Sequence, residues 1–293
     1  MRIILNKKFC FIVSLCFYLI KEIMRTSSKS VAKSNLDPSD ETVEVISITH
    51  WTNSLFSFQL KRPKSFRFKS GEFVLIGLRD TTETLILRAY SIASPSWDDT
   101  LLFYSISVKD GPLTSILSKI NPGDRVILKR KPTGTLVLDA LRRGKRLFLF
   151  ATGTGIAPFA SIIRDPMIYE SFDNIILTHT CRMKRDLAFG ELVLELRKKD
   201  ILLRDLDIKK LKYFPTLTRE KFVNTGRITS LISSGQFFRD AGIGDFSYAT
   251  DKAMVCGSME FNKEMASILK GKGMKEGSIS SPGDFVLERA FVG

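Results

Sequence analysis

The hydrophobic pattern of the chain changes once, close to residues 140–146, and this change constrains the fold more than any other feature of the sequence. Before it, apolar residues fall in short runs that are separated by turn residues. In one run Phe56, Phe58 and Leu60 alternate with polar neighbours, which is the period of a strand with one buried face. Short strands at this spacing predict an antiparallel barrel or sandwich.

After the change, continuous apolar strands alternate with helices, which is typical of a parallel α/β sheet. The sequence therefore predicts two domains, an antiparallel β-barrel over residues 37–143 and an α/β parallel-sheet domain over residues 144–293. The barrel strands are expected at 42–49, 55–60, 72–78, 86–92, 101–108 and 125–129, with one helix at 113–120. The later strands are expected at 147–151, 175–180, 212–217 and 254–256. Helices are expected directly after residue 155, at 187–199, near 228–233 and at 261–270, and the clearest of these have 10 or more residues.

Composition excludes several classes of protein. With 44% hydrophobic and 26% charged residues, the chain is not disordered, collagen-like or a multi-span membrane protein. Its four Cys form no C-x-x-C pair, so we expect no metal site and predict reduced thiols in a cytoplasmic protein. The formal charge of +14 calls for an anionic partner or ligand, which could be nucleic acid, lipid, a phosphorylated cofactor or an acidic protein.

Residues 1–36 form a basic leader that contains an apolar run at 9–20. The run is too short to span a bilayer comfortably. Its length and basic flank fit a signal peptide, but no A-x-A-like cleavage site follows. We favour the alternative that translation starts at Met24 and leaves a short disordered leader.

The first candidate binding element is the segment 88–94, RAYSIAS, at the end of a predicted barrel strand. Its Arg can bind phosphate, its aromatic ring a planar ligand, and its hydroxyl a ring nitrogen. A helix start at 110–115 follows the next strand, and its free amides with the Thr114 and Ser115 hydroxyls predict an anion site. A pyrophosphate held between Arg88 and that helix would place a flavin ring against Tyr90. Taken alone, each of these strands could equally be an ordinary strand with one half-buried face and no ligand.

The second candidate is the glycine-rich loop 151–158, ATGTGIAP, which follows an apolar strand and opens a helix. Glycines let backbone approach a ligand, and a helix N-terminus favours pyrophosphate. The pattern is G-x-G-x-x-P rather than G-x-G-x-x-G, so a simple tight turn is the alternative.

Three arginines, Arg182, Arg219 and Arg227, lie at or just beyond predicted strand ends of the second domain. The carboxyl ends of parallel strands are where α/β sheets bind ligands, and guanidinium groups suit a 2′-phosphate. An NAD-specific protein would instead carry an acidic residue at the ribose. Each arginine alone could be an ordinary surface residue, but the three together favour a phosphate.

Taken together, the motifs RAYSIAS, SVKDGPLTS, KPTGTLVLD, ATGTGIAPF and the ending ERAFVG resemble the bacterial ferredoxin/flavodoxin–NADP+ reductases. The resemblance covers about residues 40–293, in the family's order and spacing. It implies an FAD-binding barrel, an NADP-binding α/β domain, hydride transfer between NADP(H) and FAD, and single-electron transfer between FAD and ferredoxin or flavodoxin.

The resemblance also implies the roles of individual residues. Tyr90 packs on the flavin ring, Ser91 lies near its N5 atom, and Cys256 lies near the nicotinamide; these three are the expected catalytic residues. The expected FAD-binding residues are Arg88, Ala89, Tyr90, Ser91, Ser105, Ile106, Val108, Lys109, Gly111, Pro112, Leu113, Thr114, Ser115, Thr154, Ala290 and Phe291. The expected NADP-binding residues are Gly153, Gly155, Ile156, Ala157, Pro158, Thr180, Arg182, Arg219, Arg227, Gly257 and Ser258. Many relatives have Pro where this chain has Met259, which leaves the local loop open.

No Ser/His/Asp triad is evident, and neither His50 nor His179 has neighbours that indicate metal binding or acid–base work. The expected partners are acidic electron carriers, ferredoxin or flavodoxin, and we expect a monomer that needs neither nucleic acid nor membrane. One alternative is a flavin reductase or the reductase component of an oxygenase. A non-catalytic basic protein that binds nucleic acid or a membrane surface is another.

Overall fold

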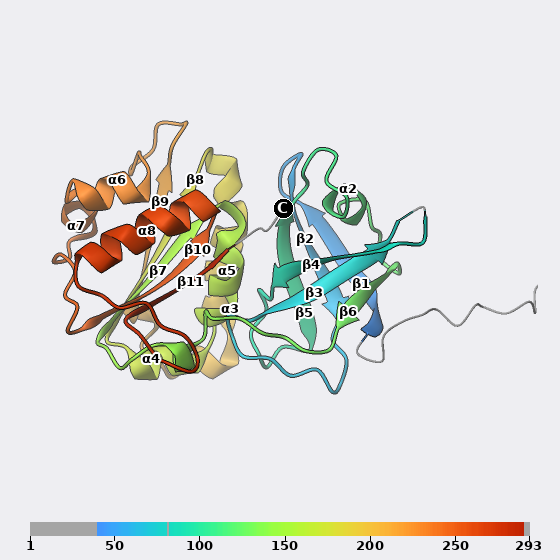
Figure 1. The fold of residues 1–293 in the computed structure, drawn as a ribbon, viewed down its shortest axis with the longest axis horizontal. Coiled ribbons are helices and arrows are strands. Elements are labelled where there is room, and N and C mark those ends of the chain that lie inside the picture. Colours follow the sequence, from blue (N-terminus) through green and yellow to red (C-terminus); the bar gives the residue numbers. More distant parts are fainter. Residues whose placement is uncertain (1–39, 81, 290–293) are drawn as a thin grey trace, which may run out of the picture. The chain divides into compact units, whose positions relative to one another are not determined.

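The computed structural model describes residues 40–80 and 82–289, and within these ranges the strands form two sheets, one of six strands and one of five (Figure 1). The predicted leader lies outside the described residues, as do Ala290 and Phe291. From Glu41 onward the chain forms one compact unit. No helix of the described part is long and apolar enough to cross a membrane.

The first sheet has the order β4-β3-β6-β1-β2-β5, and the pairs β4–β3, β3–β6, β1–β2 and β2–β5 run antiparallel. Its strands are β1 (Asp40–His50), β2 (Leu55–Lys61), β3 (Phe73–Arg79), β4 (Leu85–Ser91), β5 (Thr100–Ile106) and β6 (Arg125–Lys129). The side chains of Phe56, Phe58 and Leu60 are buried, as the period of two predicts.

Contacts between the two outermost strands close this sheet into a barrel. Just beyond β4, Ile92 pairs with Phe103 of β5, and the Ala93 amide donates to the Leu102 carbonyl at 2.8 Å. The seam between β4 and β5 therefore joins strands that are adjacent in sequence but lie at opposite ends of the sheet order.

The helix predicted at 113–120 is shorter in the structure, where α2 spans only Thr114–Leu117. Beyond Leu117 the amides of Lys119 and Ile120 bond to carbonyls three residues back, so the α-helical pattern ends there.

The second sheet has the order β11-β10-β7-β8-β9, with every neighbouring pair parallel. Its strands are β7 (Arg146–Thr152), β8 (Asn174–Cys181), β9 (Leu211–Leu217), β10 (Asp251–Gly257) and β11 (Phe285–Arg289). The helices are α3 (Ile156–Ile162), α4 (Pro166–Ser171), α5 (Ala188–Lys199), α6 (Ile228–Ser233), α7 (Gln236–Ala241) and α8 (Met259–Gly271).

Both faces of the parallel sheet are covered by helices. On β7, Leu147 and Leu149 pack in a core with α3, α4 and α5, while Phe148 and Phe150 pack in a second core with α6, α7 and α8. Burial on both faces explains why β7 is continuously apolar in sequence.

The predicted fold class, an antiparallel barrel followed by a parallel α/β domain, is confirmed. Strand β11 and the short helices α4 and α7 were not predicted. The division between residues 143 and 144 stays a prediction.

A buried ion pair links the segments that follow α3 and α5. The Arg164 guanidinium donates to both carboxylate oxygens of Asp200, at 2.7 and 2.8 Å, and both side chains are buried. Trp97, from the β4–β5 connection, lies with its ring centroid 5.4 Å from the same guanidinium. Because both side chains are buried, water could not solvate either charge if the other were removed.

We expect Asp200→Ala to lower the free energy of unfolding by about 3–5 kcal/mol, because it leaves the Arg164 charge buried without its counterion. Urea unfolding followed by circular dichroism measures this change. Glu195→Ala, which breaks an exposed pair with Lys198, is the control and should change little. Equal effects of the two substitutions would contradict the prediction.

Candidate functional site

The barrel seam carries two buried hydroxyls without partners. Tyr90 is buried on β4, with its ring edge-on to those of Phe58 and Phe103 at centroid distances of 6.0 and 6.5 Å. The hydroxyls of Tyr90 and of buried Ser105, on β5, face one another across the seam, but neither makes a hydrogen bond of ordinary geometry in the described part of the chain. Burial raises the pKa of Tyr90 to about 12, against smaller opposite effects of a weak interaction with the Ser105 hydroxyl and of the Arg88 charge. Two neutral hydroxyls whose hydrogen bonding is incomplete indicate a place where a polar ligand completes it.

Beside them on β4 lie the other residues of the first motif. Arg88 is half-buried and donates from Nη1 to the Leu87 carbonyl at 2.9 Å; no carboxylate within residues 40–80 and 82–289 pairs with it. Ala89 is exposed and Ser91 half-buried. Arg88 is therefore able to bind a phosphate group.

The segment after β5 folds into a tight turn. The Thr114 hydroxyl accepts from the Val108 amide at 3.1 Å, and the Ser115 hydroxyl donates to the Gly111 carbonyl at 2.6 Å. Buried Leu113 anchors the turn in the barrel core. The Thr114 proton and the Ser115 lone pairs remain available to a ligand. Around the turn, Ile106 is half-buried, while Val108, Lys109 and Pro112 are exposed.

The glycine-rich loop becomes a 3₁₀ turn, Gly153–Gly155, that leads directly into α3. The turn contacts β5 of the barrel as well as β7, β8 and β10. The hydroxyl of buried Thr154 has no hydrogen-bond partner in the described part. The structure thus brings Thr154 together with the barrel, while Ile156, Ala157 and Pro158 are buried in α3.

Gly155 is required for the close approach of this turn to the end of β10. A methyl group at Gly155 would lie 2.2 Å from the Cys256 carbonyl oxygen, which is backbone and has little freedom to move. Gly153 has φ +52°, and an added methyl there would meet nothing within 4 Å, so the space beside its backbone is open.

The three predicted arginines lie at one edge of the parallel sheet. The Arg219 amide donates to the Arg182 carbonyl at 3.0 Å, which joins the loops after β8 and β9. The Gly226 amide donates to the carbonyl of Leu217, the last residue of β9, which places Arg227 beside the same edge. All three arginines are exposed, and in the described part of the chain their guanidinium groups have no anionic partner.

At the end of β10, Cys256 is completely buried, and burial raises the pKa of its thiol, which is therefore neutral. Ser258 accepts a hydrogen bond from the Phe261 amide at 3.3 Å and thereby caps α8. The Thr180 hydroxyl accepts one from Thr216 at 2.8 Å. The side chains of Ser258 and Thr180 thus already have structural partners.

Glu288, which the sequence analysis did not select, also belongs to this neighbourhood. It pairs in register with Cys256 across β10 and β11, and its Oε1 accepts from the Thr135 amide at 3.0 Å. Its Oε2 is buried without a partner in the described part, and burial raises the pKa of Glu288 to about 7. An acidic residue that directly follows the apolar run Phe285–Leu287 was the signal available in the sequence.

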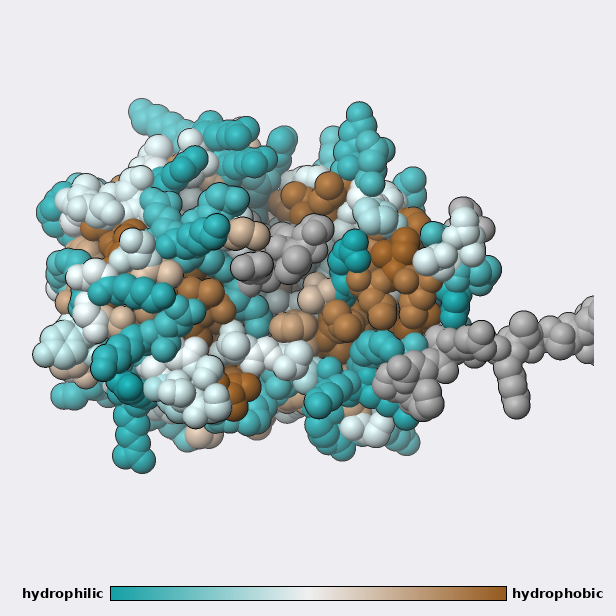
Figure 2. All heavy atoms as spheres, in the orientation of Figure 1, coloured by the Kyte–Doolittle hydropathy of each residue, from teal (hydrophilic) through white to brown (hydrophobic). Residues whose placement is uncertain are grey.

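Apolar side chains gather on the outer face of the barrel over β3 and β4, as Figure 2 shows. Leu75 is 37% exposed, and Leu85 and Leu87 on the paired strand are half-buried. Exposed Val108 and Ile116 lie near the end of β5 and on α2. A surface of this kind suits a protein partner.

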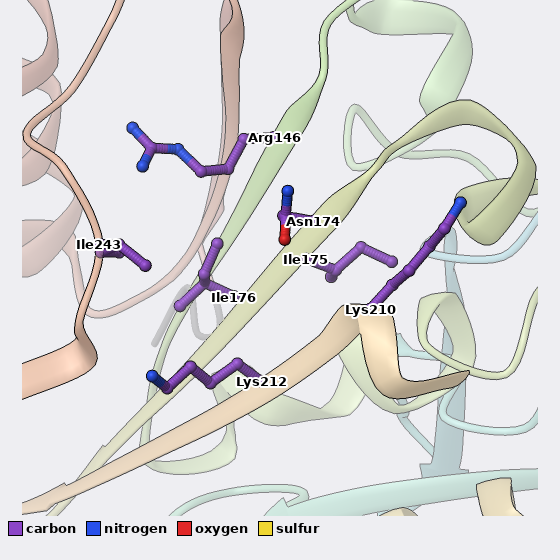
Figure 3. A pocket seen from close by; sticks show the side chains of 7 residues that line it. All are labelled: Arg146, Asn174, Ile175, Ile176, Lys210, Lys212 and Ile243. Carbon is purple, nitrogen blue, oxygen red and sulfur yellow. The ribbon is translucent and has the colours of Figure 1, made fainter. Parts of the chain in front are cut away.

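A cavity of about 180 Å³ lies at the opposite, amino-terminal edge of the parallel sheet (Figure 3). Its cationic groups are already engaged: Arg146 binds Asp251, Lys210 donates to the Tyr169 carbonyl at 2.7 Å, and Lys212 donates to that of Ala241. The cavity therefore offers a ligand few free donors.

Comparison with known proteins agrees with this arrangement. The family model described as oxidoreductase FAD-binding domain matches residues 41–137, and the one described as oxidoreductase NAD-binding domain matches residues 149–267. A flavodoxin/ferredoxin–NADP reductase of Rhodobacter capsulatus is 52% identical over 263 residues, which cover 90% of this chain and 97% of that protein. A ferredoxin–NADP reductase of Azotobacter vinelandii is 44% identical over 249 residues, covering 85% of this chain and 96% of that protein.

Among solved structures, the crystal structure of a ferredoxin NADP+ reductase from Neisseria gonorrhoeae with bound FAD and NADP superimposes with a TM-score of 0.77. It is 28% identical, and the match covers 87% of this chain and all of that one. Sequence and fold agree, and the chain belongs to the ferredoxin/flavodoxin–NADP reductase family of FAD-dependent oxidoreductases.

Proposed function

We propose that this protein is a ferredoxin (flavodoxin)–NADP+ reductase that binds FAD in the barrel and NADP(H) at the carboxyl edge of the parallel sheet. The main support is the contact of the Gly153–Gly155 turn with β5, because it brings the two candidate cofactor sites into one neighbourhood. When bound, FAD accepts hydride from NADPH and passes electrons on singly, so the protein supplies position and electrostatics.

The barrel seam fits FAD. The hydroxyls of Tyr90, Ser105 and Thr154 are buried and make no hydrogen bond of ordinary geometry in the described part, so a ligand with ring nitrogens and ribityl hydroxyls would complete their hydrogen bonding. Arg88 and the turn at Thr114 supply a cation and hydroxyls for the pyrophosphate. Tyr90 and Ser91 are proposed to contact the flavin ring.

The arginine edge fits NADP rather than NAD. Arg182, Arg219 and Arg227 supply exposed guanidinium groups for a 2′-phosphate. The nearby Glu220 carboxylate accepts from the Lys184 amide at 2.8 Å and so holds the loop after β8. The glycine-rich turn would take the pyrophosphate, with Cys256 close to the nicotinamide.

We infer that the electron acceptor is an acidic ferredoxin or flavodoxin. The apolar face of β3 and β4 offers contact area, and Lys109 and Lys119 supply exposed positive charge near α2. We also propose that the protein is monomeric and cytoplasmic.

The test is reduction of the purified protein by NADPH, followed by electron transfer to ferredoxin and flavodoxin. We expect a yellow protein whose flavin band is bleached by NADPH, and cytochrome reduction that depends on the added carrier. Efficient cytochrome reduction without a carrier would favour a flavin reductase or an oxygenase reductase component, and a colourless protein that binds DNA would refute the proposal.

We expect Arg182→Ala and Arg219→Ala to raise the KM for NADPH by about 10-fold to 100-fold each, because a charge-assisted contact to the 2′-phosphate is lost. The KM for NADH should stay nearly constant. Steady-state kinetics with both nucleotides measure the change.

Arg204→Ala is the matched control, because this exposed arginine follows α5 and the 3₁₀ turn Ile201–Leu203, before β9 begins. It should leave both KM values unchanged. An NADPH preference that survives both substitutions at the arginine edge would contradict the assignment.

Glu288 should make stability depend on pH. Its folded pKa of about 7 exceeds the ordinary 4.5, so the folded state retains a proton that the unfolded state has lost. This contribution to stability is complete below about pH 4.5 and disappears as pH rises through 7. Glu288→Gln resembles the protonated acid and does not titrate. The free energy of unfolding of this variant, relative to that of the natural protein, should therefore rise by about 2–3 kcal/mol from pH 5 to pH 8.

Urea unfolding at pH 5 and 8, with FAD at one fixed concentration, measures this difference. Glu264→Gln, at an exposed position on α8, should show no such trend. A Glu288→Gln difference that is equal at both pH values would contradict the prediction.

A further inference from the structure

His179, on β8, lies beneath the glycine-rich turn and is completely buried. Its Nε2 is 2.9 Å from the Gly153 carbonyl oxygen, and its Nδ1 is 3.2 Å from the Tyr213 hydroxyl. Tyr213 belongs to β9 and Gly153 follows β7, so the imidazole connects three neighbouring strands.

These neighbours determine which ring nitrogen carries the proton. A carbonyl oxygen only accepts, so Nε2 must donate to Gly153. Burial lowers the pKa of His179 to about 4, so the ring is neutral and Nδ1 accepts from the Tyr213 hydroxyl. The Cys181 sulfur, 3.2 Å from Nε2, lies within reach of the same N–H.

The hydrogen bond to Gly153 sets the orientation of one peptide group in the turn. In a planar trans peptide, the Gly153 carbonyl and the Thr154 N–H point in opposite directions. Because the Gly153 carbonyl points toward His179, the Thr154 N–H points to the side of the turn that faces away from His179. The second lone pair of the carbonyl accepts from the Ile156 amide at the start of α3, which fixes the same peptide from a second direction.

Glycines leave space around the His179 imidazole and beside the turn. A methyl group at Gly190, on α5, would lie 2.9 Å from His179 Nδ1 and 3.2 Å from the Tyr213 hydroxyl. Gly153 itself, with φ +52°, has open space where a side chain would stand. The chain thus has glycine both where the imidazole packs and where a ligand could approach.

We propose that His179 is a positioning residue for the pyridine nucleotide, which fixes the Gly153–Thr154 peptide so that its N–H faces the bound pyrophosphate or nicotinamide. The inference rests on the proposed function, because it takes the Gly153–Gly155 turn as the nucleotide-binding loop. Tyr213 supports the same role by fixing the imidazole tautomer. His179 itself contacts neither substrate nor cofactor in this assignment.

The experiment compares His179→Leu, which removes the donor, with His179→Gln, whose side-chain amide can still donate to Gly153. Each FAD-loaded variant is titrated with NADP+ by difference spectroscopy, and its reduction by NADPH is followed by stopped flow. For His179→Leu we expect about a fivefold to tenfold weaker affinity for NADP+, as for the loss of one neutral hydrogen bond. His179→Gln should stay within about twofold of the natural protein, and FAD content should not change.

An unchanged NADP+ affinity in His179→Leu, or equal losses in the Leu and Gln variants, would overturn the inference. If neither variant folds, Tyr213→Phe decides: a Kd for NADP+ raised by about threefold supports the role, and an unchanged one refutes it. Failure of the natural protein to bind NADP+ or to be reduced by NADPH would refute the proposed function instead.

Discussion

The site depends on the close packing of the glycine-rich turn against the end of β10. Because Gly155 has no side chain, the turn reaches the Cys256 carbonyl, where a methyl group would be only 2.2 Å away. This contact fixes where α3 begins, and α3 packs in the same apolar core as Tyr104 and Leu102 of the barrel. One close backbone approach therefore shapes the glycine-rich turn where it contacts β5 of the barrel.

Much of this arrangement could be predicted from the sequence, because the hydrophobic period separates the two kinds of sheet. The strand at 125–129 and the helix at 228–233 have the bounds expected from the pattern. Parallel topology also implied that Arg182 and Arg219 would share an edge, and the hydrogen bond between their backbones confirms that they do.

What could not be predicted depends on contacts between distant segments. Nothing local to Glu288 shows that it will lie half-buried beside Cys256, since that requires the pairing of β10 with β11. His179 had no informative neighbours in sequence, because its partners Gly153 and Tyr213 come from other strands.

The proposed FAD site lies across the barrel seam. Strands β4 and β5 are the last members of the sheet order, and they meet through the pairing of Ile92 with Phe103, the hydrogen bond from Ala93 to Leu102 and the contact of the Tyr90 and Phe103 rings. The residues assigned to FAD lie on both sides of that seam, so the bound cofactor would contact both strands and hold them together. With FAD bound there, opening of the barrel and release of the flavin would be linked equilibria, so that free cofactor would stabilise the closed seam by mass action.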